Sequence, residues 1–132
     1  MSAITSVDYQ YVVLRLVPRV EREEFINVGV VLYSQEADFL RGAVALDDAR
    51  ALALDPGLDL EAVRSALDQV CRVAAGEHSP STPRLDRLGP RFGWLSAPRS
   101  TIVQPGPVHG GTTRDPGATL EHLVQVLVRR TI

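Results

Sequence analysis

The chain of 132 residues contains no lysine, one cysteine (Cys71) and one asparagine (Asn27). A single cysteine excludes an intramolecular disulfide framework and fits a reducing compartment. The aliphatic runs stop well before the about 18 residues that suggest a membrane span. The N-terminus, MSAITSVDYQ, lacks the basic region and apolar core of an export signal. These absences predict a cytoplasmic protein that does not enter the membrane.

Charge is unevenly distributed along the chain. The formal net charge is −2, and all 14 basic residues are Arg. Between Glu36 and Asp68 eight acidic residues stand against three Arg, whereas between Arg84 and Arg114 five Arg stand against one acid. The overall charge argues against a protein that coats nucleic acid by bulk electrostatics. The basic second region keeps single-stranded nucleic acid as a minor alternative.

The first third of the chain has the pattern of β-strands. Three runs rich in β-branched and aromatic residues predict strands at 9–17, 25–33 and 39–46. The short links between these runs favour an antiparallel meander. Residues 100–103 add a short edge strand, which Pro105 would end.

Helical spacing follows the strands. The pattern predicts a short helix at 47–54 and longer ones at 59–75 and 115–128, with Asp59 and Asp115 as N-caps. The length fits a single domain over residues 1–132. We therefore expect an α+β fold: an antiparallel three- to four-stranded sheet with helices packed on one face and a long Pro/Gly-rich loop toward the other.

Alternation along the strands predicts two sheet faces of different chemistry. In the second strand, the aliphatic face takes Ile26, Val28, Val30 and Leu32. The opposite face collects aromatic, amide and charged side chains: Tyr9, Tyr11, Val13, Arg15, Phe25, Asn27, Gly29, Tyr33, Phe39 and Arg41. Burying Arg or Asn without partners costs several kcal/mol, so this polar face requires a cover or a ligand.

Residues 94–111, WLSAPRSTIVQPGPVHGG, are the segment left to cover the polar face. Their hydroxyl, amide and imidazole groups offer hydrogen bonds, and Trp94 offers a ring for the tyrosines. Arg99 beside two hydroxyls suits a phosphate or carboxylate; alternatively, it pairs with Glu24 while the hydroxyls satisfy the loop backbone. His109, before two glycines, suits a general base or a ligand contact, or alternatively a turn. Asn27 orients a ligand or ties down a neighbouring loop.

Three stretches together resemble one bacterial family. They are YQYVVLR at 9–15, EFINVGVV at 24–31, and WLSAPRST at 94–101 continued by QPGPVH at 104–109. In this order and spacing they resemble the family called domain of unknown function 3037, over nearly the whole chain. The resemblance implies a protein partner, because members often lie beside genes for HipA-like kinases.

The family pattern implies functional positions in this sequence. These positions are Arg15, Glu24, Asn27, Gly29, Pro98, Arg99, Ser100, Gln104 and His109. Relatives tend to carry Ser where this chain has Gly106, a departure that weakens any role for a hydroxyl there.

We expect a cytoplasmic binding or accessory module with a protein partner such as a HipA-like kinase. Its predicted ligand-binding residues are Arg15, Glu24, Asn27, Arg99, Ser100, Gln104 and His109. The alternative is a small enzyme acting on an anionic or phosphorylated substrate, with His109 transferring a proton. No activated nucleophile and no metal-ligand spacing accompany these residues, so no catalytic residue is assigned and no metal or cofactor is expected. The sequence leaves a homo-oligomer open.

Overall fold

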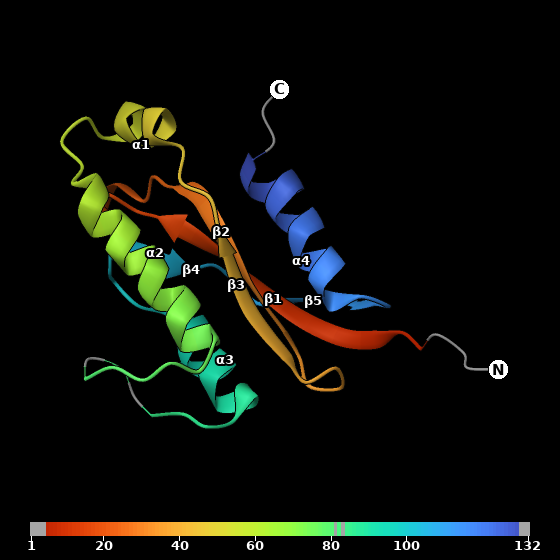
Figure 1. Ribbon diagram of the computed structural model, residues 1–132. Helices are drawn as coiled ribbons and strands as arrows, with labels where there is room; N and C mark the ends of the chain where they lie inside the picture. Colours follow the sequence, from red (N-terminus) through yellow and green to blue (C-terminus); the bar gives the residue numbers. More distant parts are fainter. Residues whose placement is uncertain (1–4, 81, 83, 130–132) are drawn as a thin grey trace.

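The computed structural model describes residues 5–80, 82 and 84–129, and in these residues it shows an α+β fold with an open antiparallel sheet (Figure 1). The strands are β1 (Val7–Leu16), β2 (Ile26–Ser34), β3 (Phe39–Val44), β4 (Val103–Pro105) and β5 (His109–Thr113). The α-helices are α1 (Asp48–Leu54), α2 (Leu60–Ala74), α3 (Leu88–Ser96) and α4 (Pro116–Val124). A 3-10 turn, η1 (Val20–Arg22), precedes β2, and a π-helical turn, η2 (Gln125–Arg129), continues α4. The predicted α+β class and the antiparallel sheet are confirmed.

β1 is the central strand of the sheet. β2 pairs with it on one side, and β3 pairs with β2, as the predicted meander requires. On its other side, β1 pairs with β4 through residues 14–16 and with β5 through residues 7–11. The 94–111 arm therefore supplies strands at one edge of the sheet, where the sequence analysis expected a short edge strand at 100–103 and otherwise a loop toward the second face.

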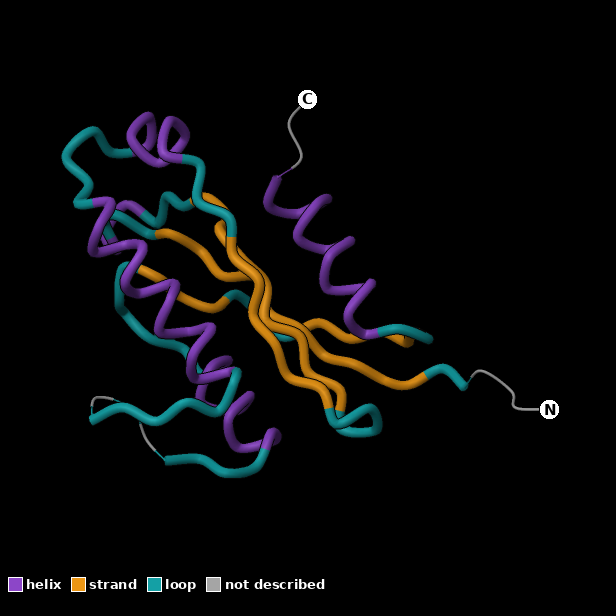
Figure 2. The backbone as a smooth tube through the Cα atoms, viewed as in Figure 1, coloured by secondary structure: helices purple, strands orange, loops and turns teal. Residues whose placement is uncertain are grey.

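The first face of the sheet is covered by α2 and α3, which lie on one side of the strands in Figures 1 and 2. The alternate residues Val12, Leu14 and Leu16 of β1 point to this face and are at most 2% exposed. They pack with Val63 and Leu67 of α2 and with Phe92 and Leu95 of α3. Burial of such side chains is the main favourable term in folding.

A β-bulge in β2 changes which residues share a face. The register passes from Leu14 opposite Gly29 to Arg15 opposite Asn27, so Val28 has no partner in β1. An extra residue on one strand shifts the alternation by one position. The prediction that Ile26, Val28, Val30 and Leu32 share one face is therefore wrong: the first two lie in the first-face cluster, and the last two lie on the second face. Tyr33, predicted for the polar face, packs on the first.

The second face carries a core of its own under α4. Val30 and Leu32 are fully buried there, against Leu120, Val124 and Val128 of the C-terminal helix. Figure 1 shows α4 on the side of the sheet opposite α2 and α3. Helices thus cover both faces, which differs from the expected arrangement. The physical reason is the bulge, because it turns two aliphatic residues of β2 toward the face that the sequence pattern had assigned to polar groups.

Helix starts follow the predicted caps. The carboxylates of Asp59 and Asp115 accept hydrogen bonds from the N–H groups of Ala62 and Ala118, at 3.2 Å and 3.1 Å. Each cap satisfies one of the backbone donors that a helix start leaves unpaired. The predicted N-caps of α2 and α4 are confirmed.

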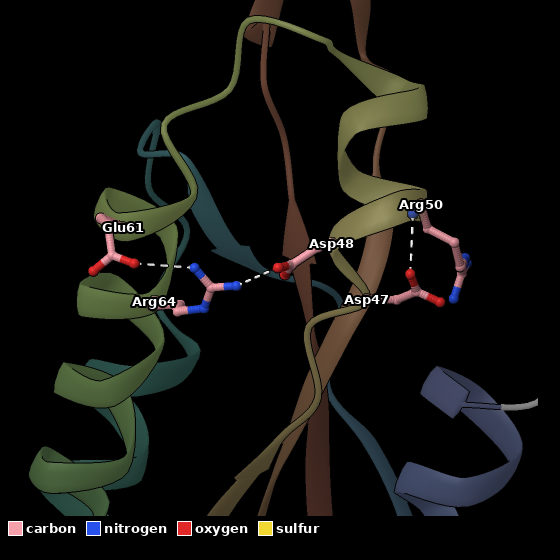
Figure 3. A network of polar contacts seen from close by, with 5 residues as sticks. All are labelled: Asp47, Asp48, Arg50, Glu61 and Arg64. Atoms are coloured by element: carbon pink, nitrogen blue, oxygen red, sulfur yellow. Dashed lines mark hydrogen bonds and ion pairs between the residues drawn. The ribbon is translucent and has the colours of Figure 1, made fainter.

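α1 is tied to α2 by an exposed ion-pair network (Figure 3). Arg64 of α2 bridges Asp48 of α1, at 2.5 Å, and Glu61 of its own helix, at 3.1 Å. Solvent screens such surface pairs, so they contribute little to stability. At the start of α1, the Asp47 side chain accepts a hydrogen bond from the N–H of Arg50, whose own side chain donates to the carbonyl of Val128 in η2.

Candidate functional site

The part of the second face that lies along β1 is not covered by a helix of the described residues. α4 packs mainly over β2 and β3. Tyr9, Tyr11, Val13 and Arg15 of β1 point to this face and are half-buried, and the two tyrosine rings pack against the margin of the second-face core. Gln104 and His109 stand beside Arg15 and Tyr11 in the neighbouring strands. We call these six residues the β1 strip.

Arg15 is the cation of the β1 strip. Its guanidinium carbon lies 4.2 Å from the centre of the Phe25 ring, a cation–π contact. Its Nε is buried and has no hydrogen-bond partner, and within the described residues the side chain forms no ion pair. A buried donor without an acceptor costs about 1–3 kcal/mol. Nε is closed to a ligand, whereas the two Nη groups of Arg15 are not buried and bond to no other described residue, so they can take an acceptor from outside.

Gly106 makes room for Arg15. A Cβ at this position would lie 3.1 Å from Nε of Arg15, closer than nine in ten Cβ contacts. The guanidinium therefore lies flat against the backbone that follows β4. This contact explains a glycine in the arm by close approach of a side chain.

At the aromatic end of the β1 strip, a glycine again makes room for a β1 side chain. The His109 imidazole lies 5.3 Å from the Tyr11 ring, centre to centre, and the Tyr11 and Tyr9 rings lie 6.1 Å apart. A Cβ at Gly111 would lie 2.7 Å from the Tyr9 hydroxyl, so that ring lies across β5. His109 is exposed. The strip thus presents flat rings at one end and a guanidinium at the other.

One of the two polar groups of the Gln104 side chain is bound within the protein. Its Cα is opposite that of Arg15, and its Nε2 donates to the carbonyl of Thr101 at 2.9 Å. The side-chain oxygen has no hydrogen bond among the described residues. Gln104 can therefore offer an acceptor, but its donor closes a turn.

Asn27 holds the C-terminal helix. Its Nδ2 donates to the carbonyl of Leu127 at 3.1 Å, and Arg50 donates to the carbonyl of Val128 at the same distance. The last carbonyls of a helix have no partner within the helix. Of the two roles left open for Asn27, the hydrogen bond corresponds to tying down a neighbouring segment, although that segment is a helix end.

Arg99 lies away from the β1 strip. Its Nη2 and Nε donate to the carbonyls of Trp94 and Ala97, the latter at 3.3 Å, at the end of α3. Its guanidinium carbon lies 4.6 Å from the centre of the Trp94 ring, and that ring packs on the first-face core. Burial lowers the pKa of Arg99. The expected contact of Trp94 with the second-face tyrosines is therefore not formed.

The two remaining predicted residues are exposed. Ser100 lies in the loop after α3. Glu24 lies before β2, where it pairs with Arg22 at 2.5 Å, and this hydrogen bond lowers the pKa of Glu24. The pairing of Glu24 with Arg99 that the sequence left open is not formed. The structure thus brings together Arg15, Gln104 and His109 out of the seven predicted residues.

Sequence reasoning missed Phe25 and the glycines as parts of the site. The sequence analysis assigned Phe25 to the polar face but did not pair it with Arg15. In the structure Phe25 lies just before β2 and is 42% exposed, so strand alternation alone does not predict the contact. The glycines at 106 and 111 were visible as a cluster in the arm. Glycines in or beside an edge strand are a signal of close approach, and here they mark which β1 side chains lie flat.

Metal and membrane features were searched in the same described residues. No group of three or more His, Cys, Asp and Glu side chains there is arranged to hold a metal ion. None of the helices in the part of the chain that the structure describes is long and apolar enough to cross a bilayer.

Fold and site together define an α+β protein with an aromatic and cationic strip beside the free edge of an open antiparallel sheet. The family model "Protein of unknown function (DUF3037)" matches residues 11–128, and the chain belongs to this family. No curated protein and no solved structure matches the chain.

Proposed function

We propose that the chain is a cytoplasmic protein-binding module whose β1 strip takes an anionic group of a partner protein at Arg15. The observation that carries the proposal is the state of Arg15: a cation held on a ring, with a buried Nε and no ion pair to a carboxylate of the described residues. A carboxylate or phosphate gains two parallel N–H bonds from a guanidinium, which makes Arg a frequent anchor in interfaces.

The partner that we propose is a HipA-like kinase, as the family resemblance implies. Flat rings at Tyr9 and Tyr11 suit a protein partner, because aromatic side chains supply contact area at low conformational cost. Glu24, Ser100 and Arg99 are outside this proposal. Their exposed or self-satisfied positions offer nothing that converges with Arg15.

The enzyme alternative requires Arg99 and His109 in one pocket. Arg99 is bound to the end of α3 and to a ring of the first-face core, whereas His109 lies beside the Tyr11 ring of the second face. This separation favours binding over chemistry on an anionic substrate. Single-stranded nucleic acid is the weaker alternative. Proteins that bind it use a positively charged groove that follows the phosphate backbone, and the β1 strip carries one Arg.

The test is affinity for the purified HipA-like kinase of the same organism, measured by biolayer interferometry with Arg15→Gln. We expect the dissociation constant to rise at least about tenfold, as for an interface anchor. The matched control is Arg84→Gln, which removes an exposed Arg in the loop before α3. Equal binding by wild type and a folded Arg15→Gln, or no binding by wild type, would refute the proposal.

A second variant displaces the Arg15 guanidinium without removing its charge. Gly106→Ala keeps Arg15 but places a methyl group 3.1 Å from its Nε, so the guanidinium must shift by a few tenths of an ångström. We expect weaker kinase binding with an unchanged far-UV spectrum. A folded Gly106→Ala that binds with wild-type affinity would count against Arg15 as the anchor.

A further inference from the structure

The two edges of the sheet differ in how they are protected. At β3, α2 packs against the strand, and the thiol of Cys71 lies 3.7 Å from the carbonyl of Gly42. At β5, Gly110 and Thr112 are exposed, and no strand of the described residues lies beyond them. An unprotected edge presents unpaired backbone groups to another chain.

The direction of the β5 backbone groups follows from the ladder. The N–H of Gly106 donates to the carbonyl of Val13, so odd-numbered residues of β1 point their backbone groups toward β4 and β5. Tyr9 and Tyr11 therefore exchange bonds with Gly111 and His109, their register partners. Since bonding alternates along an antiparallel strand, the N–H and C=O groups of Gly110 and Thr112 point away from the sheet.

We propose that two copies of this chain pair through their β5 edges, antiparallel and centred on Gly111, to form one continuous ten-stranded sheet. In this register Gly110 of each copy is opposite Thr112 of the other, and each of these residues has a backbone donor and acceptor that bond to no other described residue. Four backbone hydrogen bonds form, two from each pair. The twofold arrangement makes the contact self-complementary.

The side chains suit this register on both faces. Gly111 is opposite itself, so no Cβ separates the two strands on the second face. Each Tyr9 hydroxyl, which already lies over its own Gly111, meets the Tyr9 hydroxyl of the second copy there. The two β1 strips then form one surface across the twofold axis.

Charge also favours a second copy. No acidic or basic side chain other than His109 occurs from His109 to Thr113. In the proposed register His109 is opposite Thr113, and the exposed Val108 is opposite Arg114, whose stem can cover it. No like charges are opposed, whereas a centre at His109 would place the two imidazoles together. The opposed residues therefore favour a centre on Gly111 over a centre on His109.

The test is sedimentation velocity of the full chain over an about hundredfold range of concentration, since dimerisation follows mass action. We expect a species of twice 14.4 kDa to grow with concentration. Thr112→Pro removes an outward donor, follows a glycine that tolerates a following proline, and leaves the bonds to β1 in place. We expect its dissociation constant for the dimer to rise at least about tenfold.

The control is Thr112→Val, which keeps the backbone N–H and a side chain of similar shape; we expect it to dimerise like wild type. Hydrogen exchange of the wild type adds a readout that needs no variant. The amides of Gly110 and Thr112 gain protection with concentration, while those of His109 and Gly111 are protected throughout. A monomer at every concentration, or a dimer in which those two amides stay unprotected, would overturn the inference. Arg15→Gln remains dimeric, so this proposal and the proposed kinase binding fail separately.

Discussion

The second face of the sheet has two halves that differ in what covers them. Over β2 and β3, a helix of the same chain packs on fully buried Val30 and Leu32. Over β1, the side chains are half-buried, and Arg15 has an unsatisfied donor. The helix α4 therefore packs mainly over the aliphatic half, and the aromatic and cationic half along β1 stays partly exposed. The face that the sequence pattern treated as one polar surface therefore consists of two surfaces: one that stabilises the fold, and one that we propose binds a partner.

The largest expected effect is a loss of stability on substitution in the covered half. Leu120 is fully buried in α4 against β2, and Leu120→Ala should lower the free energy of unfolding by about 2–5 kcal/mol. The matched change in the open half is Tyr11→Ala, which should cost less because that ring is already partly in water. Urea denaturation of both variants measures the difference. Equal losses would mean that the open half is as much a part of the core as the covered one.

A smaller effect is expected where the two halves meet. Asn27→Ala removes the hydrogen bond to the Leu127 carbonyl and leaves that group without its side-chain donor. We expect a loss of about 1–3 kcal/mol and faster hydrogen exchange in η2, with kinase binding unchanged in the folded protein. Asn27→Asp is the informative control, because a carboxylate there cannot donate to a carbonyl. Lost kinase binding with wild-type stability would return Asn27 to the site.

The sequence predicted much of the fold and less of the site, for identifiable reasons. Period-two runs located β1, β2 and β3, and the Asp59 and Asp115 caps located two helix starts. One inserted residue, Val28, then changed the facing of everything after it in β2, and no propensity distinguishes a bulged Val from a paired one. Arg99 was misplaced because a guanidinium that closes a helix end has the same residue type and flanking hydroxyls as one that binds an anion.

The smallest expected effect concerns Glu24, which the sequence pattern grouped with Arg15. The hydrogen bond from Arg22 lowers the pKa of Glu24, so the ionised carboxylate contributes stability above its ordinary pKa and loses it as the pH falls through the lowered value. Both side chains are largely exposed, and solvent screens the pair. Glu24→Gln should therefore unfold in urea slightly earlier than wild type at neutral pH and together with it in acid, with kinase affinity unchanged. A large difference at neutral pH, or lost kinase binding, would show that Glu24 belongs with Arg15 in the open half after all.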